Sequence, residues 1–188
     1  MNIFIDGFQN TGKTTLIENC KFKHNRFPFN QYLEEFNLSN NRDCLNGFQI
    51  GKDLGILFGL QYSKQNVIFD RGPFSTIFYS LKEMRFNENT TTILIKFISE
   101  LKKYENCKYV FVKKINSKGE EKRNHQDGFD YLNDDEDQEK EKLLEQIIFT
   151  AKKFGVEINI FENDFSLSLK TNYHRFNDFL EGLLNEYN

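Results

Sequence analysis

Short apolar runs alternate along this chain with longer segments in which apolar residues recur at helical spacing. We expect strands at 2–6, 66–70, 108–113 and 156–161, and a further short strand within 23–30. We expect helices at about 13–22, 31–38, 44–65, 73–86, 90–105, 134–154 and 173–187. Strands that alternate with helices predict an α/β fold in three layers, a parallel sheet with helices on both faces.

The 188 residues fit a single domain spanning 1–188, and we find no internal repeat and no linker. Phenylalanine is abundant, with 21 residues, whereas tryptophan is absent. Phe fills core volume without a polar group that needs a hydrogen-bond partner, so the chain has enough apolar material for a substantial core.

Charge and hydropathy narrow the functional classes. The formal net charge is −3 and no basic stretch stands out, which argues against binding of extended nucleic acid. No apolar run approaches the ~20 residues of a membrane span, and no signal peptide is visible. Cys20, Cys44 and Cys107 lack metal-ligand spacing and suit a reducing compartment, so we expect a soluble cytoplasmic protein.

Four glycines recur at every fourth position of the expected helix at 44–65, at Gly47, Gly51, Gly55 and Gly59. Each costs about 1 kcal/mol of helix stability relative to alanine. We therefore expect a compensating contact on this stripe, either close packing of another element or a ligand.

The segment from Gly7 to Thr14 matches the pattern GxxxxGK[ST]. It follows an apolar strand directly and opens a helical segment, which is the context the motif needs. Backbone N–H groups of such a loop surround phosphate oxygens, and the positive end of the helix adds to the attraction. We expect Lys13 against the β- and γ-phosphates and Thr14 as a ligand of Mg²⁺. The residues expected to hold ATP are Gly7, Asn10, Thr11, Gly12, Lys13, Thr14 and Thr15.

This segment resembles the start of thymidylate kinases and deoxynucleoside kinases. In those families an acidic residue, here Asp6, precedes the first glycine, and two hydroxyl residues follow the lysine. The segment 67–71 (VIFDR), with Ser75 shortly after, resembles the strand of these kinases that ends in an acidic residue and an arginine. The motifs cover only these two short parts of the chain, whereas the order of elements agrees over most of it.

The resemblance implies roles for several residues. Asp70 lies near Mg²⁺ or the acceptor, and Arg71 reaches the transferring phosphoryl group. The carboxyl ends of parallel strands face the ligand crevice in open α/β sheets, which supports both placements independently. The segment 114–133 stands where these kinases carry a lid, and Arg123 is the candidate for its phosphate contact.

The acceptor site is less defined by sequence. The resemblance places a glutamate soon after the second strand, where Glu34 lies, and brings Asp6 near the substrate. Phe58 and Gln61 suit stacking and hydrogen bonding to a base. The stretch between Lys13 and Asp70 is short for a thymidylate kinase, and Tyr62 stands where those enzymes place a monophosphate-binding arginine.

We therefore expect an ATP- and Mg²⁺-dependent phosphotransferase that acts on a (deoxy)nucleoside or a nucleoside monophosphate. The alternatives are a P-loop NTP hydrolase or switch module, and a kinase of another small metabolite or of a polynucleotide end. Base preference stays open, as does oligomeric state, with a homodimer among the options.

Overall fold

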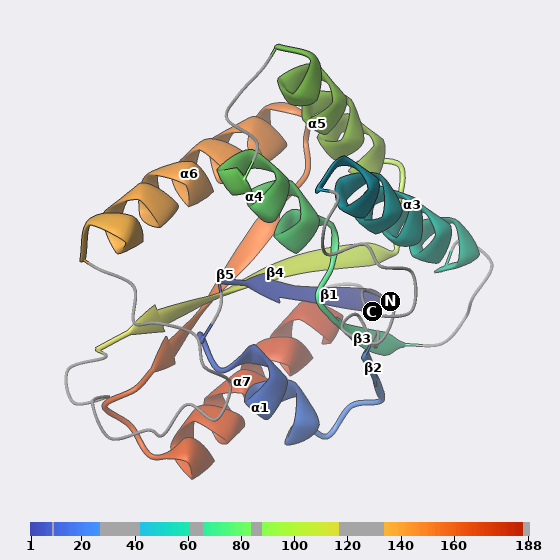
Figure 1. Cartoon of the computed structure of the whole chain (residues 1–188). Helices are drawn as coiled ribbons and strands as arrows, with labels where there is room; N and C mark the ends of the chain where they lie inside the picture. Colours follow the sequence, from blue (N-terminus) through green and yellow to red (C-terminus); the bar gives the residue numbers. More distant parts are fainter. Residues whose placement is uncertain (9, 27–41, 61–65, 84–87, 117–133, 186–188) are drawn as a thin grey trace.

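The computed structural model describes residues 1–8, 10–26, 42–60, 66–83, 88–116 and 134–185. Within these ranges the strands form one five-stranded sheet with the order β2-β3-β1-β4-β5 (Figure 1). All four neighbouring pairs are parallel, as the alternation of strands and helices predicts. The strands are β1 (Asn2–Gly7), β2 (His24–Arg26), β3 (Val67–Asp70), β4 (Cys107–Ile115) and β5 (Ile158–Asp164).

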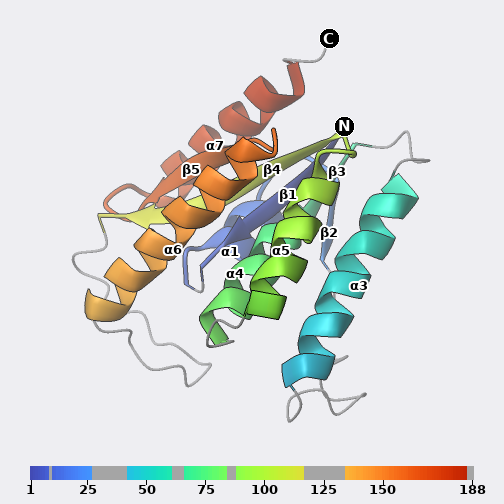
Figure 2. The same ribbon diagram turned by 90° about the horizontal axis from the view of Figure 1, so that it is seen from above.

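Helices cover both faces of this sheet and complete the predicted three layers (Figure 1). One face carries α1 (Lys13–Glu18) and α7 (Leu169–Asn185). The other carries α3 (Arg42–Leu60), α4 (Pro73–Glu83), α5 (Glu88–Leu101) and α6 (Asp134–Lys153). Seen from above, α3, α4, α5 and α6 lie beside one another over the sheet (Figure 2).

The alternation of side chains along β1 divides the core in two. Phe4 points into the cluster under α3, α4, α5 and α6, whereas Ile3 and Ile5 point into the cluster under α1 and α7. Successive residues of a strand face opposite sides of a sheet, so one short apolar strand supplies both cores. This explains why β1 is buried along its whole length.

Several expected boundaries differ from the observed ones. Strand β5 runs to Asp164, three residues beyond its expected end, because its polar last residues stay paired with β4 as far as Ile115. Helix α7 begins four residues before its expected start, where the Ser168 hydroxyl accepts the Thr171 N–H at 3.1 Å. Such a serine cap replaces an intrahelical bond that the first turn lacks. The helix expected at 31–38 lies outside the described residues.

The glycine stripe of α3 does not meet the expected contact within the described part of the chain. A Cβ atom at Gly51, Gly55 or Gly59 would find no atom within 4 Å among those residues. In the same ranges, no helix combines the length and the hydropathy that a membrane span requires.

Candidate active site

The loop between β1 and α1 turns sharply at glycine and asparagine. Gly7, Asn10 and Gly12 have positive φ angles of 151°, 62° and 77°. A Cβ atom on Gly7 would lie 2.6 Å from the Val112 carbonyl oxygen, and one on Gly12 would lie 2.7 Å from the Asn163 amide nitrogen. Only glycine fits such positions. The strand, turn and helix that the motif predicts are therefore present, with Lys13 as the first residue of α1.

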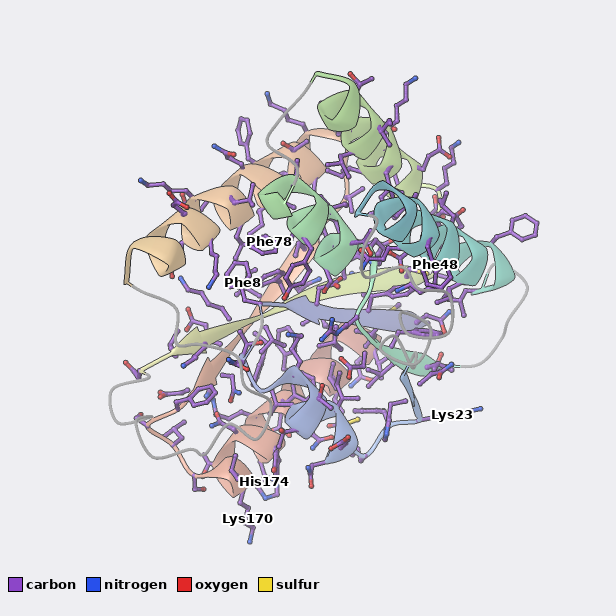
Figure 3. The ribbon with its side chains drawn as sticks, in the orientation of Figure 1. Phe8, Lys23, Phe48, Phe78, Lys170 and His174 are labelled. Carbon is purple, nitrogen blue, oxygen red and sulfur yellow. The ribbon has the colours of Figure 1, made fainter. Side chains whose placement is uncertain are left out.

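One contact within the loop and three from other parts of the chain fix its position. The Thr11 hydroxyl donates to the Phe8 carbonyl at 3.0 Å, and the Asn163 side-chain amide donates to the Thr11 carbonyl at 2.9 Å. The Phe8 ring packs against Phe78 of α4 and Phe111 of β4, with ring centroids 4.5 Å and 4.9 Å away (Figure 3). The loop is thus tied to β4, β5 and α4 rather than held by its own residues alone.

Lys13 lies inside this loop with only 8% of its surface exposed. Its ammonium donates to the Phe8 carbonyl and, at 3.3 Å, to the Thr11 hydroxyl. Burial, together with repulsion by Arg71, lowers the pKa of Lys13 from 10.5 to about 8, while Asp70 and Asp6 oppose the shift. A buried cation within a ring of backbone groups is suited to attract an anion that would compensate its charge.

Thr14 and Asp70 bring two oxygen atoms together at the start of α1 and the end of β3. The Thr14 hydroxyl donates to an Asp70 carboxylate oxygen at 3.0 Å. Mg²⁺ prefers oxygen ligands and is commonly held by one or two protein groups together with substrate phosphates. This donor pair fits such an ion. Thr15 follows with an exposed side chain in the first turn of α1.

Asp6 connects the end of β1 to the start of α4. One of its carboxylate oxygens accepts the N–H groups of Gly72 at 2.7 Å and Ser75 at 2.9 Å, and the other accepts that of Phe74 at 3.3 Å. Burial raises the pKa of Asp6, and hydrogen bonds from Ser75 and Gly72 oppose the rise. Asp6 is 1% exposed, so the expected substrate contact does not agree with the structure: its carboxylate is engaged by the backbone that follows β3.

Arg71 directly follows β3 and has an unusual backbone conformation, with a φ angle of 72°. Its N–H donates to the Ile5 carbonyl at 3.0 Å, which fixes the turn against β1, and its side chain is exposed. The next residue must be glycine, because a Cβ atom on Gly72 would lie 2.7 Å from the Phe4 side chain. Strand pairing places Asp70 beside Ile5, so Asp70 and Arg71 lie at the carboxyl ends of the strands, as the loop does.

One hollow lies beside the loop toward β5, and another lies at the end of β3. The first is lined by Gly12, Thr15, Leu16, Asn163, Phe165, Leu167, Leu169, Asn172 and Tyr173. The second is lined by Gln49, Lys52, Asp70, Arg71, Gly72, Ser75, Thr76 and Tyr79. The first hollow includes the loop residue Gly12, and the second includes Asp70, whose carboxylate accepts the Thr14 hydroxyl.

Behind the second hollow, α3 and α4 are joined by a buried polar cluster. Asp53 is 0% exposed, its one carboxylate oxygen lies 2.8 Å from the Lys52 ammonium, and its other oxygen accepts the Thr76 hydroxyl at 2.5 Å. Burial raises the pKa of Asp53, and the ammonium beside it opposes the rise.

The structure brings together the loop residues, Asp70 and Arg71, but not every predicted site residue. Phe58 is 59% exposed and lies outside the lining of both hollows, because Leu57 takes the core-facing position of α3 and the next residue turns away. Its expected role in stacking on a base does not agree with this position. Glu34, Gln61 and Arg123 lie outside the described residues, and their roles stay predictions.

Sequence reasoning missed Asn163, Lys52, Asp53 and Thr76. The expected strand ends at residue 161 and leaves Asn163 outside it, although a polar residue at the carboxyl end of a parallel strand is itself a signal for the ligand-binding end of the sheet. For Lys52 and Asp53 the signal is a pair of charges directly before a stretch of apolar residues and glycines, 54–60, in the same helix.

Replacing Asn163 with alanine should weaken ATP binding about tenfold, because the buried Thr11 carbonyl loses its donor and the loop loses its link to β5. Isothermal titration calorimetry with ATP measures this. Asn159 of the same strand donates to Tyr109 far from the loop, so N159A is the matched control. An unchanged ATP affinity in N163A would contradict the role assigned to this contact.

Comparison with known proteins agrees with this geometry at the level of fold. No family model matches the chain, and a search of the curated proteins finds no match. Among solved structures, a deoxyadenosine kinase from M. mycoides with the products dCMP and dCDP bound is similar, with a TM-score of 0.58 and 16% identity. The alignment covers 97% of this chain and 100% of that one. The same enzyme with dATP bound gives a TM-score of 0.56 and 16% identity, covering 98% and 100% of the two chains. This chain therefore has the same fold as these deoxyadenosine kinase structures.

Proposed function

We propose that this protein is an ATP-dependent phosphotransferase whose acceptor is a (deoxy)nucleoside or a nucleoside monophosphate. The observation that carries the proposal is the loop at the amino end of α1, in which the buried Lys13 ammonium faces the carbonyl of Phe8 and the hydroxyl of Thr11. The solved structures of similar fold belong to a deoxyadenosine kinase, which supports the same class of reaction.

The loop suits a triphosphate for electrostatic reasons. Lys13 carries a cation whose burial is unfavourable in the absence of an anion, and Arg71 adds a second positive charge close enough to lower the pKa of Lys13. Phosphate oxygens would relieve both effects. In a site with little water, such preorganised charges stabilise the negative charge that develops on a transferring phosphoryl group.

Thr14 and Asp70 are the residues that would hold Mg²⁺. Their oxygens lie 3.0 Å apart, so both side chains are close enough to contribute to one ion site. When bound, Mg²⁺ would neutralise charge on the β- and γ-phosphates. Arg123 remains our candidate for a further cation from the segment 114–133.

The two hollows suggest places for the two substrates. We assign the donor base to the hollow next to Gly12 and Thr15, whose lining includes Phe165 and Tyr173 as aromatic faces. We assign the acceptor to the hollow that Asp70 and Arg71 share with Lys52. An acceptor there would approach the end of the triphosphate from the side opposite the donor base, as an in-line transfer needs.

The test is incubation with γ-labelled ATP, Mg²⁺ and a panel of the four deoxynucleosides, the four ribonucleosides and their 5′-monophosphates. We expect label on at least one member and little free phosphate. Transfer to a non-nucleoside hydroxyl or to a polynucleotide end would mean that the acceptor belongs to a different class from the one proposed. Steady phosphate release that no acceptor alters would instead identify an NTP hydrolase, the second candidate, for which an apolar strand ending in Asp70 is also suited.

A further inference from the structure

Strands β4 and β5 stay paired beyond the end of β1. The last residue of β1, Gly7, lies opposite Val112 of β4. Beyond this point β4 and β5 form three further pairs: Lys113 with Glu162, Lys114 with Asn163, and Ile115 with Asp164. These six residues form a two-stranded extension of the sheet. The extension runs beside the phosphate loop, because the Asn163 amide reaches the Thr11 carbonyl.

One face of this extension lies toward the loop. Alternation along β4 puts Lys114 on the same face as Val112, which belongs to the cluster under α1 and α7. Phe161 of the same cluster puts Asn163 on this face of β5 in the same way. Lys114 therefore lies directly beside Asn163, and it is the one charged residue that the six place on this face.

The Lys114 ammonium lies over an aromatic ring of the hollow assigned to the donor base. Its nitrogen is 5.0 Å from the centroid of the Phe165 ring, and Phe165 lines that hollow. The tip of the same ring would lie 3.7 Å from a Cβ atom on Gly12 of the loop. A cation over a ring is attracted to it and can still donate hydrogen bonds to an oxygen. The ammonium thus stands where the loop meets the hollow.

The charges around this junction suit an anion. The hollow itself has no charged side chain among its described lining residues. Arg175 of α7 donates to Asn172 of that lining at 3.1 Å, and Asp164 lies close enough to balance part of its charge. Glu162, like Asp164, belongs to the other face of the extension by alternation. Among these groups, the charge of Lys114 is therefore the one left for a ligand at the loop.

We infer that Lys114 is a further binding residue for the donor nucleotide and donates a hydrogen bond to its α-phosphate. Lys13 is assigned to the β- and γ-phosphates and the hollow to the base, so a cation between them meets the phosphate that joins the two parts. Its four-carbon stem lets the ammonium move from the Phe165 ring to an oxygen. The inference rests on the proposed function in taking the loop as the donor site.

The decisive variant is Lys114→Met, which keeps the length of the side chain and removes its charge. We expect the Kd for ATP and the Kd for ADP each to rise about tenfold, because both nucleotides carry the α-phosphate. Calorimetric titration with Mg²⁺ and without acceptor measures both. In steady state the KM for ATP should rise about tenfold while kcat changes less than about twofold, because the contact is the same in the ground state and the transition state.

Two further variants separate charge from packing. Lys113 precedes Lys114 on β4, lies on the other face and pairs with Glu141 of α6 at 2.9 Å, so Lys113→Met is the matched control. It should change either nucleotide affinity by less than about twofold. Lys114→Arg keeps a cation that can stay over Phe165, so it should lose less than about threefold. A loss in K114R as large as that in K114M would mean that the shape of the lysine matters and not its charge, and would overturn the inference.

The remaining outcomes keep this inference apart from the proposed function. Unchanged affinities in K114M would overturn the inference even if label were transferred, and so would a loss confined to ATP, which would move the contact to the γ-phosphate. A protein that binds both nucleotides with the expected dependence on Lys114 but transfers no label would refute the proposed function and leave the inference standing. A wild-type protein that binds neither nucleotide would refute both.

Discussion

Replacing Lys13 with methionine should lower phosphotransfer by roughly 10²–10³-fold while the fold is retained, which would be the largest functional effect of any single substitution in this chain. Methionine keeps the length of the side chain but removes the cation that the loop holds beside Phe8 and Thr11. The measurement is kcat with γ-labelled ATP and the best acceptor of the panel. Turnover near the wild-type rate would refute the assignment of the loop.

The same substitution should not destabilise the protein, and this separates a functional lysine from a structural one. The pKa of Lys13 is about 8 when folded, against 10.5 for a free lysine, so burial of its charge costs on the order of 3 kcal/mol below pH 8. Methionine removes that cost. Urea unfolding at pH 7 should therefore give K13M a free energy of unfolding equal to or above that of the wild type.

The pH dependence of stability provides a control, because the direction of the expected change is known. Between pH 8 and 10.5 the unfolded chain binds the Lys13 proton more tightly than the folded chain does, so the free energy of unfolding of the wild type rises with pH in this window. In K13M this contribution disappears. Equal slopes for the two proteins across the window would mean that Lys13 is not the buried cation described here.

Replacing Asp6 with alanine should cost about 3–5 kcal/mol of stability, the largest structural effect we expect. The change leaves the buried N–H groups of Gly72, Phe74 and Ser75 without their acceptor and opens a cavity beneath the turn. Because that turn carries Arg71, residual folded protein should also turn over more slowly. Thermal and urea unfolding of the variant measure the first effect.

Asp178 provides the control for this substitution, because it lies exposed on α7. D178A should change the free energy of unfolding by no more than about 0.5 kcal/mol. The variant D6N, which keeps one acceptor oxygen, should fall between D6A and the wild type. A D6A protein as stable as D178A would show that the amides after β3 find other partners.

The phosphate loop could be predicted because the residues that form it are contiguous in the sequence. Gly7, Gly12, Lys13 and Thr14 stand at fixed spacing between an apolar strand and a helix, and local backbone geometry alone brings them to one turn. The parallel sheet followed in the same way from alternating strands and helices. Asp70 and Arg71 could be placed near the loop because parallel strands end at a common edge.

The partners of that loop could not be predicted, because they come from distant parts of the chain. Asn163 reaches Thr11 across 152 residues, and its position depends on how far β5 stays paired with β4. The apolar pattern predicts a strand that ends at Phe161, because this pattern reflects the burial of side chains and not the pairing of backbones. The role of Asp6 likewise depends on a turn that begins 66 residues later.

By itself, the sequence determined the order of elements, the phosphate loop and the acidic residue and arginine that follow β3, because each is encoded by neighbouring residues. The tertiary structure decided which charges are buried, which hollow each lines, and that Phe58 points away while Lys52 points in. Those properties depend on how α3 packs on α4 and on the sheet. The spacing of apolar residues in the sequence indicates which face of a helix is buried, but not which element that face contacts.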